Sequence, residues 1–317
     1  MLKADAQREG VVHGTGLAVV TGAFGYTGRR IASRLLDRGV PVRTLTARSE
    51  ASDRIDVRPL DFDDEAALVR HLEGADVLYN TYWVRFVAGR VDFDLAVRNS
   101  QTLFRAAREA GVLRVVHVSI TNPYDDPTLP YFNGKAMVEG ALARSELSYT
   151  IVRPTVMFGH GDVFINNIAW LLRRFPVFAI PGSGRYRLQP VCVDDVADVC
   201  VAAATMHDGA IVDAAGPQVF SFEELVRTIR DAIGARCALV RTPPAMALWL
   251  AKVVGLAVRD VVLTRGELDG LMQELIVSRV HACGRVRLTD WLDENAASLG
   301  RTYASELARN YRRSASS

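Results

Sequence analysis

Residues 19–36, VVTGAFGYTGRRIASRLL, decide the fold of this chain. An apolar run ends at Thr21, glycines follow at Gly22, Gly25 and Gly28, and apolar side chains then recur at the spacing of a helix. Glycines between a strand and a helix permit a tight turn and let a pyrophosphate approach the backbone, and the helix N-terminus favours its negative charge. The stretch therefore predicts a dinucleotide-binding turn, and the alternative is an ordinary glycine turn.

The side chains inside this turn, Phe24, Tyr26 and Thr27, are also expected to contact the dinucleotide. The type of dinucleotide depends on the end of the second strand, where an acidic residue would bind the ribose hydroxyls and an arginine would accommodate a 2′-phosphate. The strand PVRTLTA is followed by Arg48, and no acidic residue lies between that strand and Glu50. We therefore predict NADP(H) as the cofactor, with NAD(H) as the alternative.

Outward from this stretch, short apolar runs alternate with helical periods. We expect strands over 16–22, 41–47, 55–62, 75–80, 112–120 and 148–154, and helices over 27–39, 65–74, 93–111 and 134–145. Strands that alternate with helices indicate βαβ units and a parallel sheet buried on both faces. The sequence therefore predicts an α/β fold with a doubly wound parallel Rossmann sheet.

Beyond residue 160 the alternation loosens. A helix over 161–175, a return strand over 185–193 and a helix over 194–205 are followed by helical periods broken at prolines and glycines, which indicates a smaller, mainly helical C-terminal cap. The predicted division is a flexible tail at 1–14, an NAD(P)-binding domain at 15–160 with 188–215, a substrate-binding cap at 161–187 with 216–311, and a flexible tail at 312–317.

Composition excludes several classes of protein. With 49% hydrophobic residues, a net charge of only +2 and scattered basic residues, the 317-residue chain is expected to be globular and not to bind nucleic acid. No apolar run is long enough to cross a bilayer and the N-terminus has no apolar signal core, so we expect a cytoplasmic protein. The four cysteines form neither a CxxC motif nor a disulfide framework and are expected to be buried thiols. No metal-binding spacing occurs.

The segment LPYFNGKAMVEG places Tyr131 four residues before Lys135, at the start of an expected helix. Residues four apart share one helix face, and a nearby ammonium favours the phenolate form of a tyrosine by charge. Only three of the 38 basic residues are lysines, so an accidental pair at this place is rare. The segment therefore predicts a proton-transfer pair, although an aromatic and a basic residue on one face is the simpler alternative.

Polar residues also follow other strands. Ser119 ends the fifth strand, where a hydroxyl would lie in the ligand crevice. We expect it to orient a substrate carbonyl, whereas His117 is expected to be a core residue. Asp61 and Phe62 after the third strand, and Asn80 and Thr81 after the fourth, are candidate cofactor contacts, with simple strand-end polarity as the alternative.

The glycine turn TGxxGxxG, Ser119 and the YxxxK of YFNGK resemble the short-chain dehydrogenase/reductase superfamily. The segments IVRPTVMFG and PVCVDDVADVC extend the resemblance, which is greatest with the extended and atypical NAD(P)H-binding subgroup similar to the nucleotide-binding accessory subunit of respiratory complex I. The resemblance implies that Tyr131 is the acid/base and that Lys135 binds the nicotinamide ribose. It also implies cofactor contacts at Pro154 and Thr155.

The sequence therefore predicts an NADP(H)-dependent oxidoreductase that moves a hydride to or from a carbonyl or alcohol carbon of a small, rather apolar metabolite. The alternatives are a transient-redox epimerase or dehydratase and a non-catalytic nucleotide-binding subunit or redox sensor. A twelve-residue interval between Ser119 and Tyr131 without a serine-rich turn argues against a sugar-nucleotide epimerase. Asn99 does not align securely with the superfamily's catalytic asparagine. A homodimer is compatible with the sequence.

Two other features have simpler interpretations. Asp194 and Asp195 are expected to cap a helix. The apolar stretch from Ala245 to Val262 is expected to be a cap helix that lines the substrate pocket, and the alternative is contact with a membrane or partner surface.

Overall fold

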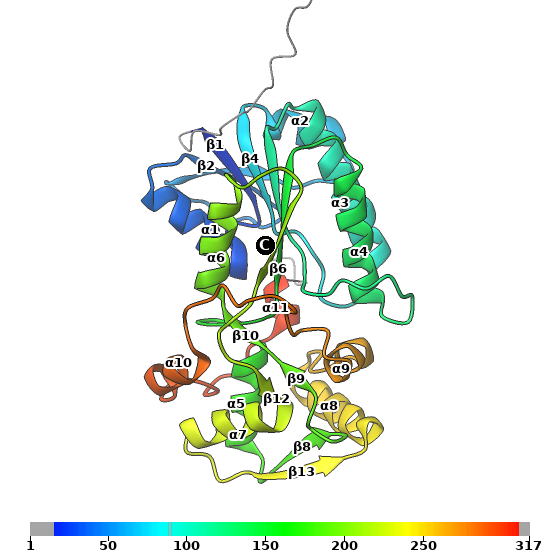
Figure 1. The fold of residues 1–317 in the computed structure, drawn as a ribbon, viewed down its shortest axis with the longest axis vertical. Helices are drawn as coiled ribbons and strands as arrows, with labels where there is room; N and C mark the ends of the chain where they lie inside the picture. Colours follow the sequence, from blue (N-terminus) through cyan, green and yellow to red (C-terminus); the bar gives the residue numbers. More distant parts are fainter. Residues whose placement is uncertain (1–15, 88, 90, 311–317) are drawn as a thin grey trace, which may run out of the picture.

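The structure is a computed structural model that describes residues 16–87, 89 and 91–310. The tails expected at 1–14 and 312–317 lie outside the described residues. Figure 1 shows a sheet flanked by helices in the upper half and a second group of helices and short strands below it.

Seven strands form one parallel sheet, as the alternating pattern predicts. Their order is β11-β6-β5-β4-β1-β2-β3. From β1 the chain adds β2 and β3 on one side and then crosses over to add β4 on the other side, so the strand order switches beside β1 while all strands stay parallel. The strands are β1 (Leu17–Thr21), β2 (Val42–Thr46), β3 (Ile55–Pro59), β4 (Ala75–Asn80), β5 (Arg114–Val118), β6 (Tyr149–Pro154) and β11 (Ala210–Ala214). Ligands of such sheets bind outside the carboxyl ends of the strands at this switch, which is where the glycine turn follows β1.

Helices cover both faces of the sheet (Figure 1). On one face lie α1 (Tyr26–Asp37) and α6 (Val193–Ala203), and on the other lie α2 (Glu65–Leu72), α3 (Phe93–Glu109) and α4 (Pro130–Ala143). Each face has its own apolar core, with Val20, Ile31 and Val196 in one and Leu45, Leu103 and Val138 in the other. Burial on both faces explains why the strands are continuous apolar runs.

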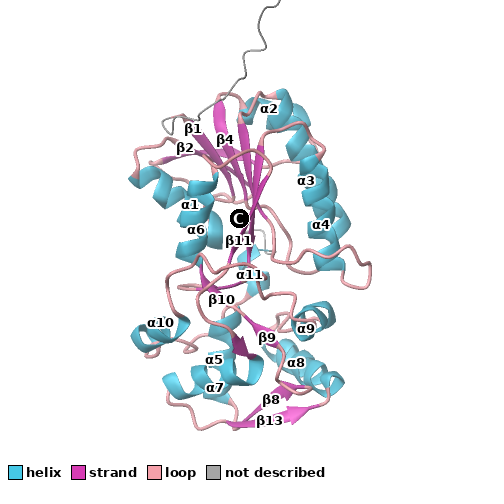
Figure 2. Cartoon of the chain, in the orientation of Figure 1, coloured by secondary structure: helices cyan, strands magenta, loops and turns pink. Residues whose placement is uncertain are grey.

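The remaining elements form the region that we call the cap. Its helices are α5 (Phe164–Arg174), α7 (Phe222–Ala232), α8 (Pro244–Val258), α9 (Arg265–Met272), α10 (Leu288–Asn295) and α11 (Glu306–Asn310). Figure 2 shows that its strands are short and scattered between the helices. Its core is a third apolar cluster that includes Ile165, Leu225 and Leu292. The prediction of a mainly helical C-terminal region agrees with these elements.

The short strands of the cap and its border pair across long sequence separations. β8 (Val177–Pro181) pairs with β13 (Ala238–Thr242), β9 (Arg187–Leu188) with β12 (Phe220–Ser221), and β7 (Val156–Phe158) with β10 (Pro190–Cys192). The return strand expected over 185–193 is therefore two strands with different partners. Segments this short have no periodicity of their own, so their partners determine where they begin and end.

The prediction that Asp194 and Asp195 cap α6 is wrong. The N-cap is Cys192, and no side chain caps the helix. Asp194 instead lies 3.0 Å from the guanidinium of Arg34 on α1, and Asp195 accepts the backbone N–H of Arg285 at 2.8 Å. Both acids lie in the first turn, where they suit the helix dipole, but partners from other segments determine their orientation.

The expectation of buried thiols is also wrong for one cysteine. Cys192, Cys200 and Cys237 are buried, whereas Cys283 is exposed and its sulfur lies 3.3 Å from the carbonyl oxygen of Asp213. Cys283 lies in an irregular segment between α9 and α10, and the residues before it, 279–282, are exposed as well.

Candidate cofactor and active site

The glycine turn is held by contacts that only glycine permits. Gly22 has a φ of +66°, and its carbonyl accepts the N–H of Gly25 at 2.8 Å. A Cβ atom on Gly28 would lie 2.3 Å from the same carbonyl oxygen. The close approach of α1 to the turn therefore requires glycine at position 28.

The N-terminus of α1 suits a bound anion. Its N-cap residue, Gly25, has no side chain to satisfy the first backbone N–H groups, and the first turn contains no acidic residue. Nearby, the hydroxyl of Thr27 lies 3.7 Å from the sulfur of Met157. The hydroxyl of Tyr26 is buried without a hydrogen-bond partner among the described residues, and burial raises its pKa above 10. A pyrophosphate would fit here because its oxygens can accept the exposed N–H groups.

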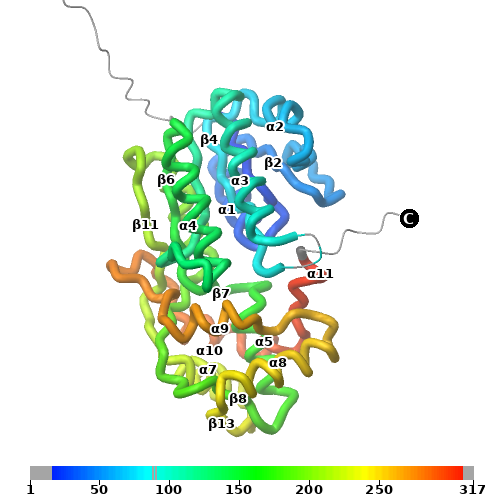
Figure 3. Tube along the Cα trace, turned by 90° about the vertical axis from the view of Figure 1, so that its right-hand side faces the viewer, coloured from blue at the N-terminus to red at the C-terminus, as the bar shows by residue number. Residues whose placement is uncertain are grey.

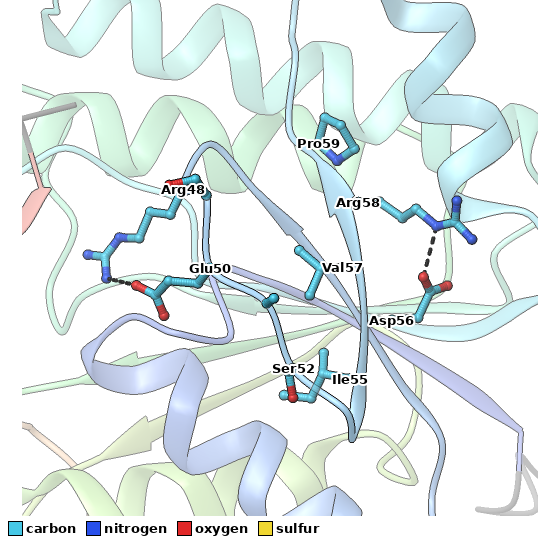
Figure 4. Close-up of a pocket in the computed structure, with 10 residues that line it drawn as sticks. Arg48, Glu50, Ser52, Ile55, Asp56, Val57, Arg58 and Pro59 are labelled. Carbon is cyan, nitrogen blue, oxygen red and sulfur yellow. Dashed lines mark hydrogen bonds and ion pairs between the residues drawn. The ribbon is translucent and has the colours of Figure 1, made fainter. Parts of the chain in front are cut away.

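Arg48, which follows β2, lies beside this turn. One guanidinium nitrogen lies 3.4 Å from the carbonyl oxygen of Phe24 and 3.3 Å from a carboxylate oxygen of Glu50, and another donates to the carbonyl of Arg309 at 2.7 Å. Figure 4 shows Arg48 and Glu50 on one side of a hollow of about 610 Å³, with β3 on the other side. The arginine therefore contacts the glycine turn and also lines this hollow.

The candidate contacts after β3 and β4 differ in exposure. Asp61 is exposed and accepts the N–H of Asp63 at 3.0 Å, and the ring of Phe62 lies 4.7 Å from that of Tyr82. Thr81 donates its hydroxyl to the carbonyl of Thr21 at 2.6 Å, directly before the glycine turn.

Asn80 is fully buried within the sheet. Its amide oxygen accepts the N–H of Tyr82 at 3.0 Å, and its amide nitrogen lies 3.1 Å from Nδ1 of His117. His117 is itself fully buried, which confirms the prediction of a core residue. Burial, followed by the charge of Lys135, lowers the pKa of His117 well below 6.5. These contacts fix Asn80 from within the sheet, and a direct cofactor contact by Asn80 stays a prediction.

Two buried hydroxyls at adjacent strand ends have no hydrogen-bond partner among the described residues. They belong to Ser119 after β5 and Thr155 after β6. The backbone N–H of Ser119 donates to Val152 at 2.8 Å, so its backbone is fixed while its hydroxyl is not. The carbonyl of Pro154 accepts the N–H of Thr121 at 3.0 Å. Buried polar atoms without partners are uncommon and indicate positions where a ligand can bind.

Helix α4 brings Lys135 to the end of β5. The side chain of Lys135 is only 2% exposed, and its ammonium nitrogen donates to the carbonyl of Val118 at 3.0 Å, next to Ser119. The same nitrogen lies 4.6 Å from the ring centroid of Trp83. One turn earlier, the ring of Tyr131 meets Trp83 edge to face at 6.0 Å between centroids. The three predicted catalytic residues are thus gathered where β5 ends and α4 begins.

Burial lowers the pKa of Lys135 from 10.5 to about 7, and the charge of Glu139 on the next turn opposes this shift. Glu139 is itself paired with Arg153 on β6 at 3.0 Å. The lysine can therefore gain or lose its proton near neutral pH before any ligand binds.

Sequence analysis missed three residues near the glycine turn and Tyr131. Trp83 forms an aromatic wall beside Tyr131. Arg85, two residues later, lies 2.7 Å from Glu267 on α9 and 3.8 Å from Glu306 on α11. Arg309, near the end of the described chain, accepts a hydrogen bond from Arg48 at its carbonyl, and its guanidinium lies over the ring of Tyr26. All three belong to loops or to the last helix, and no periodic pattern indicates where such segments fold.

Two further predictions concern residues outside this cluster. Asn99 on α3 donates to the hydroxyl of Tyr82 at 2.8 Å. Helix α8 contacts β8 and leaves large apolar side chains exposed along it: Met246, Trp249, Leu250, Val253 and Leu256. Within the described residues, no helix is long and apolar enough to cross a membrane, and no group of His, Cys, Asp or Glu residues is arranged to hold a metal ion.

A family model described as NAD(P)H-binding matches residues 22–207, which is more than half of the chain and begins at the first glycine of the turn. The chain belongs to this NAD(P)H-binding family. The resemblance drawn from the glycine turn and the YxxxK motif is thereby confirmed at the level of the family.

Curated relatives of this NAD(P)H-binding protein include both a subunit and an enzyme. NADH dehydrogenase (ubiquinone) 1 alpha subcomplex subunit 9, mitochondrial, from Arabidopsis thaliana is 28% identical over 74% of this chain and 62% of its own length. The (4-alkanoyl-5-oxo-2,5-dihydrofuran-3-yl)methyl phosphate reductase of Streptomyces griseus is 30% identical over 69% of this chain and 74% of its own length. The chain therefore spans less than two thirds of the first of these relatives.

Solved structures support the fold. The triphenylmethane reductase of Citrobacter sp. in complex with NADP(H) has a TM-score of 0.70 and 17% identity, covering 88% of this chain and 99% of that one. DesIV, a dTDP-glucose 4,6-dehydratase from Streptomyces venezuelae, has a TM-score of 0.67 and 20% identity over 88% of this chain and 95% of its own. At these identities the likeness shows the fold alone, a Rossmann-type α/β fold shared with reductases and dehydratases.

Proposed function

We propose that this NAD(P)H-binding protein is an NADP(H)-dependent oxidoreductase that reduces a carbonyl group, or oxidises the corresponding alcohol, with Tyr131 as the acid/base. The observation that carries the proposal is the buried ammonium of Lys135, which lies 3.0 Å from the carbonyl beside Ser119 and one helical turn from Tyr131. Burying a lysine is costly, and ionisable groups perturbed in this way cluster at functional sites.

In this proposal each residue has a separate task. A bound nicotinamide supplies or accepts the hydride. The hydroxyl of Tyr131 donates a proton to the substrate oxygen during reduction and removes it during oxidation. Lys135 favours the phenolate of Tyr131 by charge, and the unpartnered hydroxyl of Ser119 hydrogen-bonds the substrate oxygen.

The preference for NADP(H) rests on Arg48, whose guanidinium lies at the glycine turn where a 2′-phosphate would need a cation. The class of substrate rests on the aromatic side chains around Tyr131. Its ring contacts those of Trp83, Phe93 and Phe132 at centroid distances of 6.0, 5.9 and 5.6 Å. Such a wall favours a small and rather apolar carbonyl compound.

The relatives support a second candidate function. Because a relative named as an NADH dehydrogenase subunit matches 74% of this chain, the protein could bind a nucleotide without turnover as part of an assembly. The likeness to a dehydratase fold favours a third possibility, a reaction in which the cofactor is reduced and reoxidised within one cycle.

The purified protein, assayed with NADPH and NADH and a broad panel of carbonyl compounds, distinguishes these candidates. Oxidation of NADPH that depends on an added carbonyl compound is the expected result. Dinucleotide binding without oxidation by any compound would favour the nucleotide-binding subunit and contradict the proposal. Cofactor that survives purification and is not consumed would favour transient redox chemistry.

A further inference from the structure

The last described helix lies beside the glycine turn that follows β1. Helix α11 (Glu306–Asn310) is far from the glycine turn in sequence, yet Arg48 donates to the carbonyl of Arg309 across a separation of 261 residues. Figure 3 shows α11 between the sheet above and the cap below. A segment of the cap thus reaches the predicted cofactor site.

The start of α11 is bound by residues of both the cap and the sheet region. The buried carboxylate of Asp260 accepts the backbone N–H of Glu306 at 2.8 Å and that of Leu307 at 3.1 Å. The side chain of Glu306 lies 3.8 Å from Arg85, which follows β4 of the sheet and also binds Glu267 at 2.7 Å. The helix therefore holds a defined position between the cap and the sheet.

At the end of α11, the guanidinium of Arg309 lies near the side chain of the first residue of α1. Arg309 donates to the carbonyl of Gly161 at 2.6 Å, and its guanidinium carbon lies 5.8 Å from the ring centroid of Tyr26, the first residue of α1. A carbonyl bond uses one of five N–H donors and brings no countercharge. The remaining donors can bind another acceptor at this helix N-terminus.

The charge around this turn favours an anion. Arg30 lies over the same ring of Tyr26 at 5.2 Å and donates to the carbonyl of His160 at 2.5 Å. The carboxyl group of Asp162 interacts electrostatically with Arg309, but burial raises its pKa to about 7, so it is only partly charged at neutral pH. Arginines and the positive end of a helix dipole therefore converge on a turn without an acidic residue.

We propose that Arg309 is a ligand of the cofactor's pyrophosphate and that α11 closes the dinucleotide site from the cap side. The inference rests on the proposed binding of NADP(H) at the glycine turn and adds a residue from the far end of the chain. The pyrophosphate is the group concerned because the guanidinium of Arg309 lies over the ring of Tyr26, the first residue of α1, and the N-terminal N–H groups of this helix favour phosphate oxygens. Arg48, which follows β2, is then the cation that would bind the 2′-phosphate.

The test measures dissociation constants of NADPH, NADH and ADP-ribose for the full chain and for Arg309→Gln. All three ligands carry the pyrophosphate, so each should bind about 10- to 100-fold more weakly to the variant, as expected for the loss of a charged hydrogen bond. Arg309→Lys, which keeps the charge, should recover part of the affinity. Arg48→Gln should weaken NADPH more than NADH or ADP-ribose, because it removes the cation for the 2′-phosphate in addition to the hydrogen bond to the carbonyl of Arg309.

Arg301→Gln is the matched control, because this exposed arginine of the same C-terminal segment bonds the carbonyl of Ala297 and should not affect binding. Thermal unfolding of each variant shows whether it is folded. Unchanged or tighter binding by Arg309→Gln, or a loss confined to NADPH, would overturn the inference while leaving the proposed function intact. A wild-type protein that binds none of the three ligands would overturn both.

Discussion

The sheet region and the cap of this protein differ in how far local sequence patterns determine their structure. In the sheet, strands of five or six residues pair in parallel and are buried by helices on both faces. In the cap, β8 and β13 pair across about sixty residues, and α8 exposes Trp249 and Leu256 at 62% and 74%. Local sequence patterns determine the first region, whereas long-range packing determines the second. The position of the glycine turn after β1 could therefore be predicted from the sequence, and the pairing of segments within the cap could not.

The largest effect is expected from Gly28 in the glycine turn, compared with an uncrowded glycine of the cap. In Gly28→Ala, the new methyl group would overlap backbone atoms of the glycine turn, which cannot move aside, and overpacking of this kind costs about 1–3 kcal/mol. We expect dinucleotide binding to be lost in a fluorescence titration. Gly266→Ala in α9, where no atom lies within 4 Å of the new Cβ, should leave binding unchanged. Equal effects of the two substitutions would contradict a site built around the turn.

The lysines of the two regions provide a second contrast. Because the pKa of Lys135 falls from 10.5 to about 7 on folding, the unfolded chain binds more protons between these values. Lys135 therefore destabilises the folded state most below pH 7. As pH rises from about 7 toward 10.5, the free energy of unfolding increases by about 1.4 kcal/mol per pH unit. Urea unfolding between pH 7 and 9 should show this slope in the wild type and not in Lys135→Met.

Lys252→Met is the control for this slope, because Lys252 is exposed on α8. It should keep the pH dependence of the wild type. A slope that survives in Lys135→Met would show that the buried ammonium is not its source.

Arg85 joins the two regions, so its removal tests how they are held together. Arg85→Met would leave Glu267 and Glu306 without their shared cation, and we expect a loss of about 1–3 kcal/mol in the free energy of unfolding. Arg227→Met removes an exposed pair with Glu223 and should cost less than about 0.5 kcal/mol. Denaturant unfolding measures both. An equal, small loss would show that Arg85 does not join the regions.

The smallest effect is expected on the outer face of α8. Leu256→Glu places a charge on a side chain that is already exposed, so stability should change by less than about 0.5 kcal/mol. The Michaelis constant for the substrate should also stay the same. An increase in this constant would show that α8 lines the substrate pocket, as the sequence analysis expected.

Individual residues show how far sequence analysis reached. The glycine turn, the alternation of strands with helices in a parallel sheet and the position of Lys135 at the end of β5 follow from local spacing and from the geometry of parallel sheets. The contacts of Arg85 with Glu267 and of Arg309 with Gly161 join segments about 180 and 150 residues apart. Asp195 likewise does not cap α6 as its place in the sequence predicts, because the backbone N–H group that it accepts is about 90 residues away. No short pattern encodes such partners.

The central claim is that Tyr131 transfers the proton in a site that binds the dinucleotide independently of it. The most direct test is a single-turnover measurement of NADPH oxidation by the wild type and by Tyr131→Phe, both saturated with NADPH and supplied with the most active carbonyl compound of the panel. The account predicts equal NADPH affinity and a rate about 100- to 10,000-fold lower in the variant. Equal rates in the two proteins would contradict it.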